Sequence, residues 1–313
     1  MSSAAFRPPR DRLVLETNDP RVLGLAARLW RRGAANDGEP PIRIRVVVAA
    51  GAADGEPGAD MPERRLTWEH APAEFRCGIP GLFSARIVLA DATIEATAAP
   101  SLLDEASAAS AGLAARSLLE APVAVLLARR GWRALHAGAV SGPKGAVVVR
   151  GASGAGKSTL VAAAHAAGLD VLGDESILVA REDPDALAAC VRELTLRADS
   201  AALLGILAST TPAFSGGEDK RRVDLTEGAR PEAREARRVT TLLLGPRTPG
   251  PARLVPLDTA EFLSEFARGE IPQEHVDGGA SSIARSWALG GGARLDGSSD
   301  LAGAVALLKA LVT

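Results

Sequence analysis

A glycine-rich stretch near the middle of the chain, RGASGAGKSTLV from Arg150 to Val161, contains the residues best suited to chemistry. Its Gly-x-x-x-x-Gly-Lys-Ser spacing predicts a P-loop, in which backbone N–H groups surround phosphate oxygens. Lys157 would reach the β- and γ-phosphates, and the hydroxyl of Ser158 would bind Mg²⁺. The residues expected to bind the nucleotide are Gly151, Ala152, Ser153, Gly154, Ala155, Gly156, Lys157, Ser158 and Thr159. A transport motor, a GTP switch and a kinase all suit such a loop, so the motif alone does not say where the phosphate goes.

The flanking residues place this loop between a strand and a helix. GAVVVRG (Gly145–Gly151) is a nearly uninterrupted β-branched run, as a buried parallel strand would be. KSTLVAAAHAAG then has helical spacing and ends at Gly168. The positive end of that helix would strengthen the attraction of the loop for phosphate.

A transporter ATPase is one candidate, because FSGGEDKRRV (Phe214–Val223) resembles the Leu-Ser-Gly-Gly-Gln signature of those proteins. In a transporter, a buried strand ending in Asp-Glu should follow the signature and hold Mg²⁺ and the attacking water. Here VTTLLLGPRTPG follows, with Gly-Pro in the place of the acids. The transporter interpretation therefore fails at the residues that would perform the chemistry.

An acidic pair lies elsewhere, in DVLGDES, at the end of the first strand-like run after the P-loop helix. Adjacent side chains at a strand end point to different sides, so one acid can face the acceptor and the other the metal. We expect Asp174 to act as the base and Glu175 to bind Mg²⁺ directly or through water. The alternative is that either acid is a solvated turn residue.

The segment from Leu135 to Leu257 resembles the catalytic core of HPr kinase/phosphorylase and its kinase-like relatives. That family has a His-Ala or His-Gly pair one strand before the P-loop and an acidic pair after it. The matching residues here are His136-Ala137 and Asp174-Glu175. Later segments, among them RELTLRADSAALLG and RRVTTLLLGPR, match more loosely.

The resemblance implies a P-loop domain like that of PEP carboxykinase, with a mixed sheet, and ATP-dependent phosphorylation of a serine hydroxyl. It implies that Asp174 is the acid/base, that Glu175 helps to bind the metal, and that His136 lies close to the phosphate. On the residues alone, a single histidine at a strand end is usually structural. Both interpretations of His136 stay open at this point.

Lysine is rare in this chain, since only four of its 36 basic residues are lysines: Lys144, Lys157, Lys220 and Lys309. Lys220 lies next to Arg221 in a short basic cluster before a strand. This cluster is either a solvated edge or a mobile loop that brings positive charge to the transferred phosphoryl group, which would make Lys220 a catalytic residue. No role is assigned to Lys144 or Lys309.

Three departures separate the chain from the bifunctional enzyme of that family. The bifunctional enzyme has two aspartates where this chain has Asp174 and Glu175, and a glutamate where this chain has Thr159. Its Glu-x-Arg-Gly-Leu-Gly segment is replaced by RELTLRAD. These departures argue against phosphorylase activity and against HPr itself as the substrate; kinases of ribosomally made peptides share this divergent pattern.

Composition excludes several classes of protein. The net charge of −2 and an aromatic content of 3% without tyrosine argue against a nucleic-acid partner. No run is long enough to span a membrane, and the N-terminus does not resemble a signal peptide. Cys77 and Cys190 lie far apart, so we expect buried hydrophobic residues rather than a disulfide or a zinc site. We expect a cytoplasmic protein with no membrane partner.

The character of the sequence changes near Gly131. Residues 1–130 alternate strand-like runs with helical stretches at Pro20–Arg32 and at 101–130, and predict a smaller α+β region of unknown role that could recognise the acceptor. Residues 131–313 predict the catalytic α/β domain, with further helices at Thr259–Arg268 and Leu301–Val312.

We therefore expect an ATP- and Mg²⁺-dependent kinase that acts on a serine of a peptide or small protein, and that forms a homo-oligomer as the family does. Two alternatives remain at this stage. One is a nucleotide-binding regulatory protein that hydrolyses ATP slowly, and the other is a small-molecule kinase of the same fold.

Overall fold

The computed structural model is a mixed α/β protein, and the residues that it describes divide into two compact units. One unit contains Met1–Arg130 and Pro212–Lys220, and the other contains Gly131–Thr211 and Arg221–Thr313. Seven α-helices lie in the described residues, which are 1–7, 11–32, 40–50, 67–103, 115–188, 193–206, 210–215, 218–224, 235–246, 248–269, 274, 279–297 and 299–313.

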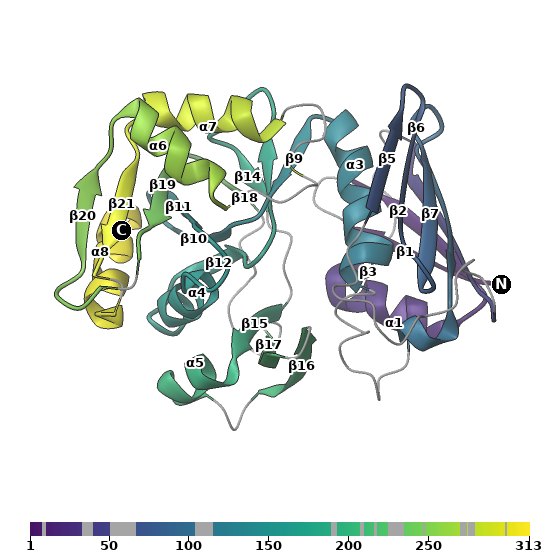
Figure 1. The fold of residues 1–313 in the computed structure, drawn as a ribbon, viewed down its shortest axis with the longest axis horizontal. Helices are drawn as coiled ribbons and strands as arrows, with labels where there is room; N and C mark the ends of the chain where they lie inside the picture. Colours follow the sequence, from purple (N-terminus) through teal and green to yellow (C-terminus); the bar gives the residue numbers. More distant parts are fainter. Residues whose placement is uncertain are drawn as a thin grey trace. The chain divides into compact units, whose positions relative to one another are not determined.

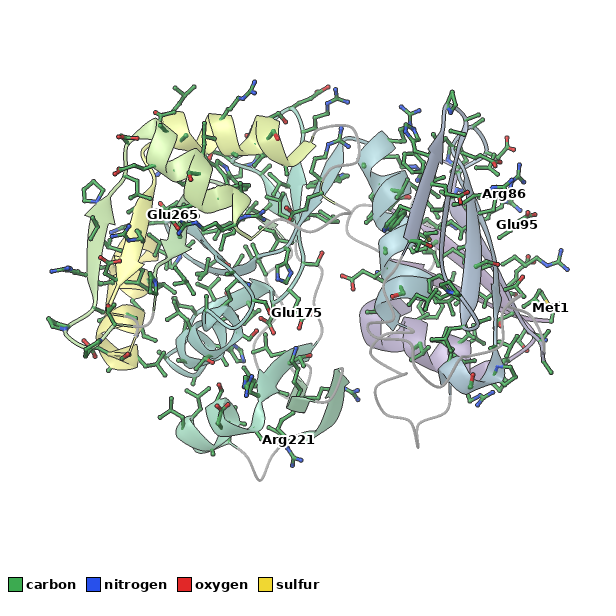
Figure 2. All side chains as sticks on the ribbon, in the orientation of Figure 1. Met1, Arg86, Glu95, Glu175, Arg221 and Glu265 are labelled. Carbon is green, nitrogen blue, oxygen red and sulfur yellow. The ribbon has the colours of Figure 1, made fainter. Side chains whose placement is uncertain are left out.

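The first unit is built on an eight-stranded mixed sheet in the order β3-β1-β2-β4-β8-β7-β6-β5. Its strands are β1 (Ser2–Arg7), β2 (Leu13–Thr17), β3 (Arg31–Arg32), β4 (Ile42–Val48), β5 (Thr67–Ala71), β6 (Glu74–Ile79), β7 (Phe83–Val88) and β8 (Thr93–Ala98). Buried and exposed residues alternate along β4 and β7, so one face packs on the core and the other meets solvent. Arg86 and Glu95, labelled in Figure 2, form an exposed ion pair of 3.7 Å on the solvent face.

Helices cover the buried face of this sheet. They are α1 (Pro20–Leu29), a 3₁₀ turn (Pro100–Leu103), a π-helical segment (Ala115–Glu120) and α3 (Ala121–Arg129). The side chain of Asp19 caps α1 by accepting a hydrogen bond from the N–H of Arg21, 2.9 Å away. Cys77 is buried as expected, and burial raises the pKa of its thiol to about 12.

The second unit contains a six-stranded mixed sheet in the order β12-β10-β11-β19-β21-β20 (Figure 1). Its strands are β10 (Gly138–Gly142), β11 (Gly145–Arg150), β12 (Asp170–Gly173), β19 (Val239–Leu244), β20 (Arg253–Pro256) and β21 (Ala293–Asp296). The central strands β11, β19 and β21 are parallel, and the outer pairs are antiparallel. The β-branched run predicted as a buried parallel strand is β11.

Helices pack on both faces of this sheet, which explains why β11 is apolar on both sides. On one face, α4 (Lys157–Ala166) and α8 (Leu301–Val312) pack against Val147 and Val149 of β11. On the other face, α6 (Thr259–Ala267) and α7 (Gly279–Leu289) pack against Val148. Figure 1 shows the two pairs of helices on opposite sides of the sheet.

A smaller antiparallel sheet, in the order β18-β14-β13-β9, lies beside the larger one. Its strands are β9 (Trp132–Leu135), β13 (Ile177–Ala180), β14 (Leu187–Ala188) and β18 (Glu235–Ala236). Within the described residues, three short connections join the two sheets: residues 136–137 from β9 to β10, residues 174–176 from β12 to β13, and residues 237–238 from β18 to β19. Because β9 pairs with β13 and β10 with β12, the first two connections run side by side.

The remaining elements of the chain are short. They are β15 (Glu193–Arg197), α5 (Ala198–Leu203), β16 (Thr211–Ser215) and β17 (Glu218–Asp224). No helix in the described part of the chain is both long and apolar enough to cross a membrane.

Two sequence expectations need correction. The helix predicted from Pro20 to Arg32 ends at Leu29, because Trp30 has an extended backbone and Arg31–Arg32 pair with β1. The helical run expected over 101–130 is helical in segments, with a 3₁₀ turn at its start and a π-helical segment before α3; residues 104–114 lie outside the described residues, as does Cys190.

Candidate functional site

The predicted P-loop connects the end of β11 to the start of α4. Gly154 and Gly156 have φ values of +78° and +102°, which L side chains rarely adopt, so glycine suits both positions. A Cβ at Gly151 would lie 3.1 Å from the Cβ of Leu244, because the loop begins against the end of β19. Residues 152–154 are exposed, so the tip of the loop is open to a ligand.

Lys157 folds back over this loop. Its side chain is buried, and Nζ donates hydrogen bonds to the carbonyl oxygens of Gly151 (2.8 Å) and Ala152 (3.2 Å). Burial lowers the pKa of the ammonium, while the nearby carboxylates of Asp174 and Glu175 act in the opposite direction. A buried ammonium beside a glycine-rich loop is suited to form charge-assisted hydrogen bonds with phosphate oxygens.

The hydroxyls at the start of α4 have different surroundings. Ser158 is half-buried in the first turn of the helix, next to Lys157. Thr159 donates its hydroxyl hydrogen bond to Ser200 Oγ, 2.9 Å away in α5. Because the Thr159 hydroxyl is bonded to α5, we expect Thr159 to contribute to the nucleotide site through its backbone.

Asp174 lies directly after β12 and is only 3% exposed. The N–H of Thr195 in β15 donates a hydrogen bond of 3.1 Å to its Oδ2, which orients the carboxylate. The turn is tight, since a Cβ at Gly173 would lie 2.5 Å from the carbonyl oxygen of Ser176. Asp174 and Lys157 interact electrostatically, so the acid that was selected by its position in the sequence lies near the lysine of the predicted P-loop.

Glu175 and His136 meet where the two sheet-to-sheet connections run side by side. Glu175 has a φ of +84°, and its carbonyl oxygen lies 2.8 Å from Nδ1 of His136. Since a carbonyl oxygen only accepts, Nδ1 carries the proton, and Nε2 of the neutral ring is an acceptor. Burial lowers the pKa of His136, and the positive charge of Lys157 lowers it further. His136 therefore stabilises the backbone of the turn that carries Asp174 and Glu175. The Glu175 side chain, labelled in Figure 2, is half-exposed.

A buried ion pair lies behind the loop. Arg150, the last residue of β11, donates two hydrogen bonds to the carboxylate of Glu274, at 2.8 and 2.7 Å, and both side chains are fully buried. The guanidinium also donates to the carbonyl oxygen of Phe266 (2.9 Å) and lies 3.9 Å from the centre of its ring. Glu274 additionally accepts a hydrogen bond from the N–H of His136.

The Arg150–Glu274 pair links the start of the P-loop to the β9–β10 connection, which carries His136. The sequence contains one signal for it, because a charged residue at the end of a fully apolar strand needs a buried partner. Nothing in the spacing of the chain identifies Glu274 as that partner, and our sequence analysis missed it.

Lys220 belongs to a different compact unit from the P-loop. It lies in β17, in the segment Pro212–Lys220 that belongs to the other compact unit. Its catalytic role stays a prediction. The next residue, Arg221, donates a hydrogen bond from Nε to Thr210 Oγ1 (3.0 Å) within the second unit and is labelled in Figure 2. Part of the apparent transporter signature, 216–217, lies outside the described residues.

Among the described residues, no three His, Cys, Asp or Glu side chains converge on one point that could hold a metal ion. A P-loop magnesium site does not need such a cluster, because Mg²⁺ keeps several waters and takes most other ligands from phosphate. One hydroxyl and one carboxylate suffice, and Ser158 and Glu175 supply groups of these types.

Comparisons with known proteins add no family to these observations. No protein-family model matches the chain, and a search of curated proteins finds no significant match.

Proposed function

We propose that this protein is an ATP- and Mg²⁺-dependent kinase that phosphorylates a serine hydroxyl of a peptide or small protein. The observation that carries the proposal is the position of Asp174. This carboxylate is buried, oriented by the N–H of Thr195, and interacts electrostatically with the lysine of the P-loop. A transferase needs a carboxylate beside the phosphate cradle, whereas a loop that only binds nucleotide does not.

The loop fits the triphosphate of ATP. Lys157 and the N–H groups of the loop would bind the β- and γ-phosphates, and the first turn of α4 adds the positive end of a ten-residue helix. Ser158 and Glu175 would hold Mg²⁺, which when bound neutralises charge on the β- and γ-phosphate oxygens.

Asp174 acts on the acceptor. The serine oxygen attacks the γ-phosphorus, and the bond from that phosphorus to the oxygen it shares with the β-phosphate breaks. The proton of the serine hydroxyl passes to Asp174, and ADP leaves with Lys157 still paired to its β-phosphate. His136 fixes the backbone of the turn that carries both acids, and Glu274 fixes the backbone of His136.

The architecture supports the finer fold assignment that the resemblance implies. A mixed sheet with helices on both faces and a P-loop after a central parallel strand is compatible with a PEP-carboxykinase-like domain of the HPr kinase type. This assignment is part of the proposal.

The test is an assay of phosphoryl transfer. The protein is incubated with ATP labelled in the γ-phosphate, Mg²⁺ and synthetic peptides whose sequences are encoded next to its gene. We expect label in one peptide, on serine, and its loss when that serine is replaced by alanine. Label found only in inorganic phosphate would instead favour the slowly hydrolysing regulatory protein, and label in a low-molecular-weight acceptor would favour a small-molecule kinase.

A further inference from the structure

A second concentration of positive charge lies in the same unit, at the strand ends opposite the P-loop. There the structure has a cavity of about 1160 Å³. Four cationic side chains line it, from the β10–β11 turn, from the residues before β19 and from α8: Lys144, Arg237, Arg238 and Lys309. Asp170 is the one acidic side chain among the described residues of the lining. The excess of positive charge favours an anionic ligand.

Close backbone contacts hold the chain around this cavity. The turn between β10 and β11 is held against α8 by a hydrogen bond from the N–H of Lys144 to the carbonyl oxygen of Val312 (2.9 Å). A Cβ at Gly145, where φ is +154°, would lie 2.5 Å from the carbonyl oxygen of Arg238. Arg238 itself has a φ of +64°, a strained conformation that only firm surrounding contacts maintain. The cations are therefore presented by a preformed backbone.

The cationic side chains of this cavity can still form hydrogen bonds and ion pairs with a ligand. Lys144 is exposed. Lys309 donates one hydrogen bond, to the carbonyl oxygen of Ala167 (3.0 Å), and an ammonium has three N–H donors. Arg237 pairs with Asp183 at 3.0 Å, but both side chains are well exposed, so this pair is weak. Polyanions compete effectively for such groups.

The identity of the cations is informative because lysine is rare in this chain. Two of its four lysines, Lys144 and Lys309, line this one cavity, and a third, Lys157, belongs to the P-loop. Apart from Lys220, the other basic residues of the chain are arginines. A lysine ammonium is a compact, adjustable point charge, and it binds phosphate in this manner.

The cavity is distinct from the phosphate loop. β11 begins beside the cavity and ends at the loop, so the two sites lie about 17–20 Å apart at about 3.3 Å per residue. β12 and α4 also join them: β12 runs from Asp170 toward Asp174, and α4 runs from Lys157 toward Ala167.

We propose that this cavity is a second ligand site, which binds a small polyanion bearing at least two phosphate or carboxylate groups. Its cations surround the space from three separate elements, as recognition of a multiply charged small molecule requires. The site does not depend on the proposed kinase activity.

The scarcity of lysine provides a direct test. The folded protein is acylated with a limiting amine-reactive reagent, with and without pyrophosphate or citrate, at constant ionic strength, and each lysine is quantified by mass spectrometry. We expect saturating anion to slow the acylation of Lys144 and Lys309 at least about fivefold, with one half-saturating concentration for both. The amine of Met1, which is exposed and belongs to the other compact unit, serves as the internal reference.

Variants separate this site from the P-loop. Protection of Lys144 and Lys309 should persist in Lys157→Ala, which removes the phosphate-binding lysine. In calorimetric titrations with the same anion, made in the Lys157→Ala background so that the P-loop does not contribute, Lys144→Gln should weaken binding about tenfold, since a charge-assisted hydrogen bond is lost. Lys144 is exposed, so this variant keeps the fold, and Arg253→Gln on β20 removes an equal charge away from the cavity as a control. The proposal is overturned if neither anion protects Lys144 and Lys309, or if protection disappears in Lys157→Ala.

Discussion

At the scale of single residues, the site combines a buried carboxylate, a buried ammonium and a neutral imidazole. Asp174 and Lys157 are each almost fully buried and interact, so each reduces the cost of burying the other. His136 completes the group through the backbone of Glu175 rather than through a charged side chain. In the proposed mechanism, this arrangement gives the histidine a positioning role and leaves the acid–base role to Asp174.

The lowered pKa of His136 predicts how stability responds to pH. The folded protein binds a proton at His136 only below the ordinary pKa of 6.5, so the unfolded chain takes up this proton first as the pH falls. The contribution of the neutral histidine is present above that value and is lost on acidification. We expect the free energy of unfolding, from urea titrations at pH 7.5 and 5.5, to decrease by the order of 1 kcal/mol more in the wild type than in His136→Asn. Equal decreases in the two proteins would contradict the assigned environment.

The sequence alone identified most of this group. Strict P-loop spacing located Lys157 and Ser158, and the acid after the next strand-like run located Asp174. It did not locate Glu274, because this partner of Arg150 lies 124 residues away and belongs to no local pattern. It also did not show that the Thr159 hydroxyl bonds to Ser200, since that contact depends on how α5 packs on α4.

At the scale of elements, two neighbouring sheet-to-sheet connections and one buried ion pair hold the site in place. The connections carry His136 and Asp174 to the same edge of the larger sheet. Arg150 and Glu274 then join the end of β11 to the first of them. The proposed catalytic groups thus rely on an ion pair whose two side chains are fully buried.

We expect Glu274→Gln to lower the free energy of unfolding by about 3–5 kcal/mol, because it leaves the Arg150 guanidinium buried without its counter-charge. The double variant Arg150→Met/Glu274→Leu should recover part of this loss, since an apolar pair of similar volume needs no desolvation of charge. Urea denaturation measures both effects.

The matched control is Glu265→Gln, which removes one partner of the ion pair with Arg268, whose side chain is 63% exposed. Glu265 is labelled in Figure 2. Glu265→Gln should change the free energy of unfolding by no more than about 1 kcal/mol. Equal effects of Glu274→Gln and Glu265→Gln would show that the buried pair does not hold the site together.

Local signals predicted the elements that carry strong patterns, and missed those that do not. The Asp258 capping box marks the start of α6, and the β-branched run marks β11. The segment DVLGDESILVARE, whose apolar residues indicate strand, forms two strands in different sheets, because the tight turn after Gly173 redirects the chain. Helix α7 was missed, although the glycines that directly follow it, Gly290 and Gly291, are typical of a helix end.

At the scale of the whole molecule, each compact unit has a core of its own. The first packs α1 and α3 on one face of its sheet, and the second packs helices on both faces. The P-loop and both acids lie in the second unit. The composition change near Gly131 is a weak signal of this division, and nothing in the sequence indicates that Pro212–Lys220 groups with the first unit.

Separate cores predict separate responses to nucleotide. We expect two transitions in differential scanning calorimetry, of which Mg²⁺–ADP raises only one, because a ligand stabilises only the unit that binds it. At a concentration one hundred times its Kd, the gain is about 2.7 kcal/mol. The shift should disappear in Lys157→Ala. An equal shift of both transitions would mean that the units unfold together.

The central claim, that Asp174 directs phosphate onto a hydroxyl, is tested most directly by comparing Asp174→Asn with wild type. Phosphoryl transfer from labelled ATP to the accepted peptide and the affinity for Mg²⁺–ATP are measured on the same preparations, with Glu182→Gln, an exposed carboxylate of the same unit, as the control. We predict that Asp174→Asn reduces transfer at least about a hundredfold and leaves nucleotide affinity nearly unchanged, while Glu182→Gln alters neither. Transfer by Asp174→Asn at the wild-type rate would contradict the account.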